Sequence, residues 1–153
     1  MNQRKMVVIG EGGVGKSTLI SLLQGKSGET EEHSPTIGVN VEKYSVDKTD
    51  FCIWDFGGQK RFQFMWDDFL RGSSLTILVT DSSYSNVKET KDIIKRHKNH
   101  LGSKIIAIAN KQDISGSLSP KEVSEILGVP TYGMVAINND NRKSLFKIMK
   151  KQI

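Results

Sequence analysis

The segment 10–17 has the residue types and spacing of a loop that holds phosphate groups. It reads GEGGVGKS, follows the apolar run Met6–Ile9 and leads into leucines at helical spacing. In the pattern G-x-x-x-x-G-K-[ST], glycines let backbone N–H groups close around phosphate oxygens, the lysine bridges the terminal phosphates and the hydroxyl reaches Mg²⁺. The segment therefore predicts a nucleoside triphosphate site formed by Gly12, Gly13, Val14, Gly15, Lys16, Ser17 and Thr18.

A second polar loop, NKQD at residues 110–113, follows the apolar run Lys104–Ala109. The carboxylate of Asp113 can accept hydrogen bonds from the N1–H and N2 amine of guanine, whereas adenine has no such amine. A site built around such a bond rejects the wrong base on the order of 10⁴-fold. Lys111 can lay its methylene stem along the base, and Asn110 can tie this loop to the phosphate loop. Together the two loops predict a guanine nucleotide.

Apolar runs and helical patterns alternate along the whole chain, which predicts the elements that carry these loops. Continuous apolar runs indicate a parallel sheet covered on both faces, whose ligands collect beyond the carboxyl ends of the strands. Both loops lie at such ends. Strands are expected over Met6–Ile9, Val39–Val46, Phe51–Phe56, Leu75–Thr80, Lys104–Ala109 and Met134–Ile137, and helices over Lys16–Gln24, Gly57–Gly72, Asn86–His100, Ser119–Leu127 and Arg142–Lys151.

Composition excludes several classes of protein. The chain has 153 residues, which is one domain at about 100–200 residues per domain. No apolar run approaches the ~20 residues of a membrane span, and Met1–Lys5 does not read as a signal peptide. A single cysteine, Cys52, rules out a multi-cysteine metal site and favours a reducing, cytoplasmic location. The net charge of +5 is compatible with an anionic ligand but does not indicate which one.

The two loops, with the sequence DFGGQ at residues 55–59 between them, resemble the guanine-nucleotide-binding proteins of the Ras superfamily. The stretches PTIGVNVE (35–42) and WDFGGQ (54–59) are more similar to the Arf and Arf-like branch than to Ras or Rab. The resemblance covers residues 1–153 as one domain. It implies a three-layer α/β P-loop GTPase fold, with a six-stranded, mostly parallel sheet, one antiparallel strand and five helices on the two faces. The activity that it implies is hydrolysis of GTP to GDP and phosphate, with Mg²⁺ as cofactor.

The resemblance also implies roles for single residues. Thr36 would reach Mg²⁺ and the γ-phosphate, and Asp55 would hold Mg²⁺ through water. The Gly58 N–H would touch the γ-phosphate, Gln59 would orient the attacking water, and the Ala136 N–H would read the guanine O6. The implied catalytic set is Gln59, Lys16, Gly58 and Thr36, the metal set is Ser17, Thr36 and Asp55, and the nucleotide set adds Asn110, Lys111, Asp113, Val135 and Ala136.

The chain departs from the family's pattern before the last helix and at both ends. Val135-Ala136-Ile137 replaces Ser-Ala-Lys, which reduces side-chain support for the base. Asn2 replaces the glycine that is myristoylated, and the ending KKQI has no cysteine for prenylation, so no covalent membrane anchor is expected. No arginine lies between Lys16 and Lys60. Because an arginine supplied in trans is worth ~10³–10⁵-fold, we expect slow hydrolysis that an activating protein accelerates.

In Arf-like proteins a surface patch recruits effectors in one nucleotide state, and the matching positions here are Val39, Trp54 and Phe69, with Trp66 nearby. Core packing is the alternative for these side chains. Exchange and activating proteins are further expected partners of a monomeric switch. Basic residues cluster at 88–98 and again at 143–151, but no stacking aromatics interleave with them, so no nucleic acid is expected. Two other functions stay open: a module that holds guanine nucleotide without hydrolysing it, and a P-loop kinase, which would have no use for residues 110–113.

Overall fold

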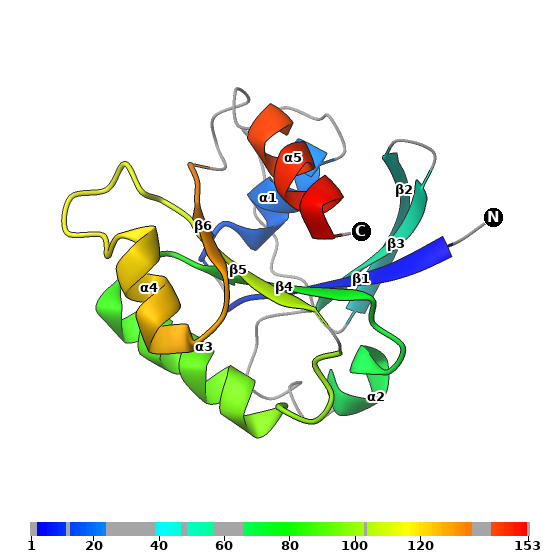
Figure 1. Ribbon diagram of the computed structural model, residues 1–153, viewed down its shortest axis with the longest axis horizontal. Helices are drawn as coiled ribbons and strands as arrows, with labels where there is room; N and C mark the ends of the chain where they lie inside the picture. Colours follow the sequence, from blue (N-terminus) through cyan, green and yellow to red (C-terminus); the bar gives the residue numbers. More distant parts are fainter. Residues whose placement is uncertain are drawn as a thin grey trace.

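The computed structural model describes residues 3–11, 13–23, 39–46, 49–56, 66–102, 104–135 and 142–152. Within these residues one sheet runs in the order β2-β3-β1-β4-β5-β6 (Figure 1). Its strands are β1 (Gln3–Ile9), β2 (Val39–Val46), β3 (Thr49–Phe56), β4 (Leu75–Thr80), β5 (Ile105–Ala109) and β6 (Thr131–Gly133). All neighbouring strands pair in parallel except β2, which is antiparallel to β3.

Helices cover both faces of this sheet. They are α1 (Lys16–Leu23), α2 (Trp66–Leu70), α3 (Tyr84–Arg96), α4 (Pro120–Leu127) and α5 (Arg142–Gln152). Figure 1 shows α1 and α5 on one face and α2, α3 and α4 on the other. The predicted three-layer α/β fold is therefore confirmed. Among the described helices, none combines the length and apolar character that crossing a membrane requires.

Successive side chains of the central strands point to opposite faces of the sheet and pack into two separate cores, one on each face. From β1, Met6 and Val8 pack with α1 and α5, while Val7 and Ile9 pack with α2, α3 and α4. All four side chains are fully buried. Burying an aliphatic side chain contributes about 1.5–3 kcal/mol, so continuous apolar strands are stable only between two helical layers.

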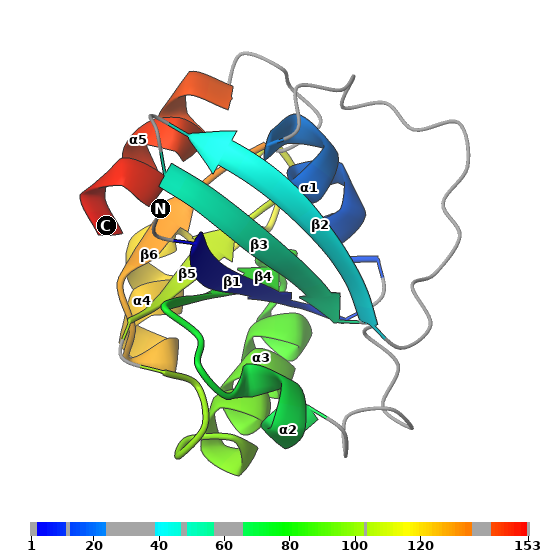
Figure 2. The ribbon, with the colours of Figure 1, turned by 90° about the vertical axis from the view of Figure 1, so that its right-hand side faces the viewer.

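The hairpin of β2 and β3 forms the edge of the sheet, and Figure 2 shows β2 as the outermost strand. The predicted bounds of β2 are confirmed, and β3 begins two residues earlier than expected, at Thr49. β1 also begins earlier, at Gln3, because its polar first residues pair with β3, as in Gln3 with Asp50. Backbone pairing of polar residues leaves no hydropathy signal in the sequence.

The last strand was expected at residues 134–137, and this prediction is wrong. β6 is Thr131–Gly133, where Thr131 pairs with Ala107 and Gly133 with Ala109. The strand is short and only partly buried, and its sequence TYG has no apolar run that would predict a strand. Met134 is buried but follows the strand, and residues 136–137 lie outside the described part.

Local capping explains the bounds of two helices. α3 begins at Tyr84 because the Ser83 side chain accepts a hydrogen bond from the Asn86 N–H, and it ends four residues before the expected His100. α4 begins with a capping box between Ser119 and Glu122, and serine followed three residues later by glutamate is the sequence pattern typical of one. The hydrogen bond from the Ser119 backbone N–H lowers the pKa of Glu122 from its ordinary value. α2 lies within the expected segment 57–72, of which residues 57–65 lie outside the described part. The polar segment 26–35, whose sequence indicates a loop, also lies outside the described residues.

Candidate nucleotide site at the strand ends

The phosphate loop lies between β1 and α1, as its sequence predicts. Gly13 and Gly15 have φ angles of +85° and +95°, in the left-handed region that favours glycine. A Cβ atom on Gly15 would also overlap the side-chain amide of Asn110. The Leu19 N–H donates to Gly15 O at 2.9 Å, so the first turn of α1 starts directly at the loop and points its positive end there. Gly12 lies outside the described residues.

Lys16 is buried at the start of α1, and its Nζ lies 2.9 Å from Oδ1 of Asp55. Asp55 reaches this position because β3 pairs with β1, with Asp55 beside Val8. The exposed Ser17 follows Lys16 on the first turn of α1. The structure thus brings together a lysine, a carboxylate and a hydroxyl that the sequence predicts for phosphate and Mg²⁺.

Mg²⁺ prefers hard oxygen ligands and usually keeps several waters, so it is bound through one or two carboxylates. The Ser17 hydroxyl and the Asp55 carboxylate fit these preferences, and the third expected ligand, Thr36, lies outside the described residues. Within the described ranges, no three His, Cys, Asp or Glu side chains are grouped so that they could hold a metal ion among themselves. The donors therefore suit an ion that is shared with phosphate oxygens rather than one enclosed by protein.

The base loop begins directly after β5, and two side chains join it to the phosphate loop. Asn110 Nδ2 donates to Val14 O at 2.9 Å, and Lys111 Nζ donates to Gly13 O at 2.6 Å. The prediction that Asn110 ties the two loops together is confirmed. Asp113 is exposed at the end of this loop. One ligand with phosphates at one end and a base at the other could therefore contact both loops.

Further hydrogen bonds join the base loop to the segments that follow β6 and β4. The Gln112 N–H donates to Met134 O at 3.2 Å, which brings the segment after β6 and its Val135 beside the loop. The Ser82 hydroxyl and the Gln112 side chain also bond to each other at 2.8 Å. Sequence reasoning missed Ser82 and Gln112. A usable signal was that Ser82 follows an apolar strand at the same edge of the sheet.

Thr36, Gly58, Gln59 and Ala136 lie outside the described residues, as do the side chains of Val39 and Phe69.

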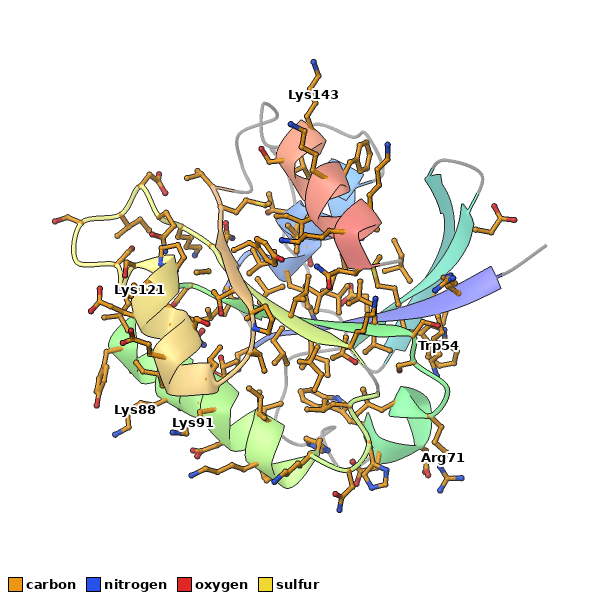
Figure 3. The ribbon with its side chains drawn as sticks, viewed as in Figure 1. Trp54, Arg71, Lys88, Lys91, Lys121 and Lys143 are labelled. Atoms are coloured by element: carbon orange, nitrogen blue, oxygen red, sulfur yellow. The ribbon has the colours of Figure 1, made fainter. Side chains whose placement is uncertain are left out.

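Of the expected partner patch, the structure describes both tryptophans. Trp54 is half-buried on β3, with Lys5 Nζ 3.9 Å from the centroid of its ring. Lys5 Nζ also donates to Arg71 O at 2.8 Å, and burial lowers the pKa of Lys5. Figure 3 shows Trp54 and Arg71 on the same side of the molecule, beside α2. Trp66 is only 1% exposed, so its expected surface role is wrong and it packs in the core.

Basic side chains point outward from several helices. Figure 3 shows Lys88 and Lys91 on α3 and Lys143 on α5, on opposite sides of the molecule. Acidic Glu89 and Asp92 lie among the basic residues of α3. This distribution is typical of solvated helix faces.

The strand order, the phosphate loop and the base loop are those of a small GTPase. The model of the ADP-ribosylation factor family matches residues 1–150, so the chain belongs to that family. It is 36% identical over 131 residues to ADP-ribosylation factor-like protein 5 of Caenorhabditis elegans, covering 83% of this chain and 72% of that protein. It is 30% identical over 131 residues to ADP-ribosylation factor-like protein 2 of Arabidopsis thaliana, covering 83% and 70%.

A solved structure has a similar fold over nearly the whole chain. The Arl6 BBS3 small GTPase from Trypanosoma brucei, with the nucleotide analogue GppNp bound, matches with a TM-score of 0.77. The match covers 99% of this chain and 100% of that one at 22% identity. The Arf-like resemblance of the sequence and its fold class are confirmed.

Proposed function

We propose that this Arf-family GTPase binds GTP and GDP with Mg²⁺, hydrolyses GTP slowly and acts as a nucleotide-dependent switch. The observation that carries the proposal is the direct contact between the two loops. Asn110 and Lys111 bond to Val14 and Gly13, although 96 and 98 residues separate the partners in the chain. These bonds set the separation between a phosphate site and a base site, which a nucleotide requires and a free phosphate does not.

At the phosphate end, Lys16 supplies positive charge. Its present partner is the Asp55 carboxylate, and phosphate oxygens offer the same kind of acceptor to its ammonium group. Ser17, Asp55 and Thr36 would hold Mg²⁺, which when bound neutralises phosphate charge. Gln59 would orient the attacking water beside the Gly58 N–H. Since no arginine lies between Lys16 and Lys60, we propose that an activating protein supplies one.

At the base end, Asp113 selects guanine. Its carboxylate accepts from N1–H and the N2 amine, while Val135 and Ala136 follow the segment that Gln112 holds beside the loop. A bound adenine would leave the carboxylate unpaired, which costs affinity. Thr36 and Gly58 would both contact the γ-phosphate, so loss of the γ-phosphate would release the segments that contain these two residues. That release would change the surface around Trp54 to which effectors bind.

The substitution Asp113→Asn tests the proposal. Asparagine presents an amide donor where the aspartate accepts, so the variant should prefer xanthine, which has a carbonyl at position 2. We expect GDP affinity to fall by at least about 100-fold and affinity for xanthosine diphosphate to rise, both measured by calorimetry.

The matched control is Asp92→Asn, an exposed aspartate on α3, which should change neither affinity. If Asp113→Asn leaves both affinities unchanged, or if the wild-type protein binds ATP as tightly as GTP, the loop does not read a guanine and the proposal is wrong.

A further inference from the structure

Ser82 lies two residues after β4 and is completely buried. Its φ angle is +68°, in the left-handed region that disfavours residues with a Cβ atom. Glycine would adopt this backbone without strain, so the serine side chain requires an explanation of its own.

The Ser82 hydroxyl supplies that explanation, because it joins the two residues on either side of Lys111. It donates to Asn110 O at 2.6 Å and accepts from Gln112 Nε2 at 2.8 Å. A carbonyl oxygen only accepts, so the single hydroxyl proton must point to Asn110. The oxygen can then only accept from Gln112, which orients the amide of that side chain.

The second amide proton of Gln112 is also used. Gln112 Nε2 donates to Leu118 O at 2.9 Å, and the Leu118 N–H donates back to Ser82 O at 2.8 Å. Ser82 therefore bonds to both ends of segment 110–118. In this arrangement one buried hydroxyl bonds to the backbone of Asn110 and to the side chain of Gln112, the residue immediately before Asp113.

We propose that Ser82 and Gln112 are positioning residues for guanine recognition. They hold the backbone that presents Asp113, whereas Asn110 and Lys111 hold the phosphate loop through separate bonds. Loss of the Ser82 hydroxyl should therefore weaken base discrimination more than phosphate binding. This inference rests on the proposed function and adds the residues on which its specificity depends.

The test compares GDP with inosine diphosphate, which differs from GDP only in lacking the N2 amine. Ser82→Gly removes the hydroxyl and relieves the strained backbone, so it should stay folded. Ser82→Ala removes the hydroxyl alone. In both variants we expect the preference for GDP over inosine diphosphate to fall about tenfold, chiefly through weaker GDP binding.

Gln112→Ala should cause a similar loss, and the double variant Ser82→Gly/Gln112→Ala should lose little more, because the two residues act through one bond. The matched control is Ser115→Ala, an exposed serine in the same loop, which should keep the wild-type preference.

The outcomes separate the two proposals. A Ser82→Gly protein that keeps the wild-type preference, or that loses affinity for both nucleotides by the same factor, overturns the positioning role alone. A wild-type protein that binds both nucleotides equally overturns guanine recognition itself, and the positioning role with it.

Discussion

The two tryptophans of the chain differ in burial, and burial determines what each can do. Trp66 is 1% exposed, and its ring centroid lies 5.4 Å from that of His97. Trp54 is half-buried, with the Lys5 ammonium group over its ring. A partner could reach Trp54 beside that cation, while Trp66 contributes to the stability of the core.

Alanine substitutions should separate these roles. Trp66→Ala should lower the free energy of unfolding by about 3–5 kcal/mol, because it leaves a cavity in the core. Trp54→Ala should lower the free energy of unfolding by clearly less than Trp66→Ala and leave GDP affinity unchanged. The GTP-loaded and the GDP-loaded forms of this variant should also capture the same set of partner proteins. Urea unfolding and affinity capture measure the two effects, and a Trp54→Ala protein that still captures the GTP-specific partners contradicts the patch.

Among the elements, α2 depends most on contacts with its neighbours. It has five residues, and a helix that short is not stable alone. Trp66 and Leu70 anchor it in the core, and Asp67 Oδ1 lies 2.6 Å from His97 Nδ1 at the end of α3. His97 is 6% exposed, so this bond is shielded from water on the side of α3. The bond thus connects α2, which follows Gly58 and Gln59 in the chain, to the end of α3.

A double-mutant cycle of Asp67→Asn and His97→Ala should give a coupling energy of about 1–2 kcal/mol in urea unfolding. Asp68 and Arg71 provide the comparison, since their side chains are 3.7 Å apart and 81% and 77% exposed. That pair should couple by less than about 0.5 kcal/mol, because water screens exposed charges. Equal coupling energies for the two pairs would show that burial of His97 does not strengthen the Asp67 bond.

At the scale of the whole molecule, the sheet brings together parts of the site that are far apart in the chain. The phosphate loop follows β1, Asp55 lies on β3 and the base loop follows β5, with β4 between β1 and β5. A bound nucleotide would therefore connect both halves of the sheet. At the phosphate end of this site, Lys16 lies against Asp55.

Hydrolysis should be slow and should depend on Gln59. In a single-turnover assay, Gln59→Leu should hydrolyse GTP at least about tenfold more slowly than the wild-type protein while binding GTP equally well. Gln152→Leu, at the end of α5, should hydrolyse at the wild-type rate. If wild-type and Gln59→Leu proteins hydrolyse GTP at equal rates, the chain is better described as a module that holds its nucleotide.

The parts of the protein that could be predicted from sequence depend on local or periodic patterns. The phosphate loop requires particular residue types at adjacent positions, and the structure has Gly13 and Gly15 at positive φ there. The capping box of α4 is equally local, because Ser119 and Glu122 are three residues apart. Apolar runs predicted the central strands, since a strand that is covered on both faces must be apolar throughout.

Only the tertiary structure decided the contacts that join distant segments. The bonds from Ser82 to Asn110 and Gln112 span 28 and 30 residues, so the position of Ser82 after an apolar strand indicates the edge of the sheet but not these partners. The position of β6 does not follow from an apolar run, because backbone pairing with β5 stabilises this strand. For Trp66, hydrophobic residue type alone does not distinguish the surface patch from core packing, and burial in the folded chain decides for the core. In each case the determining interaction forms only when the sheet brings remote parts of the chain together.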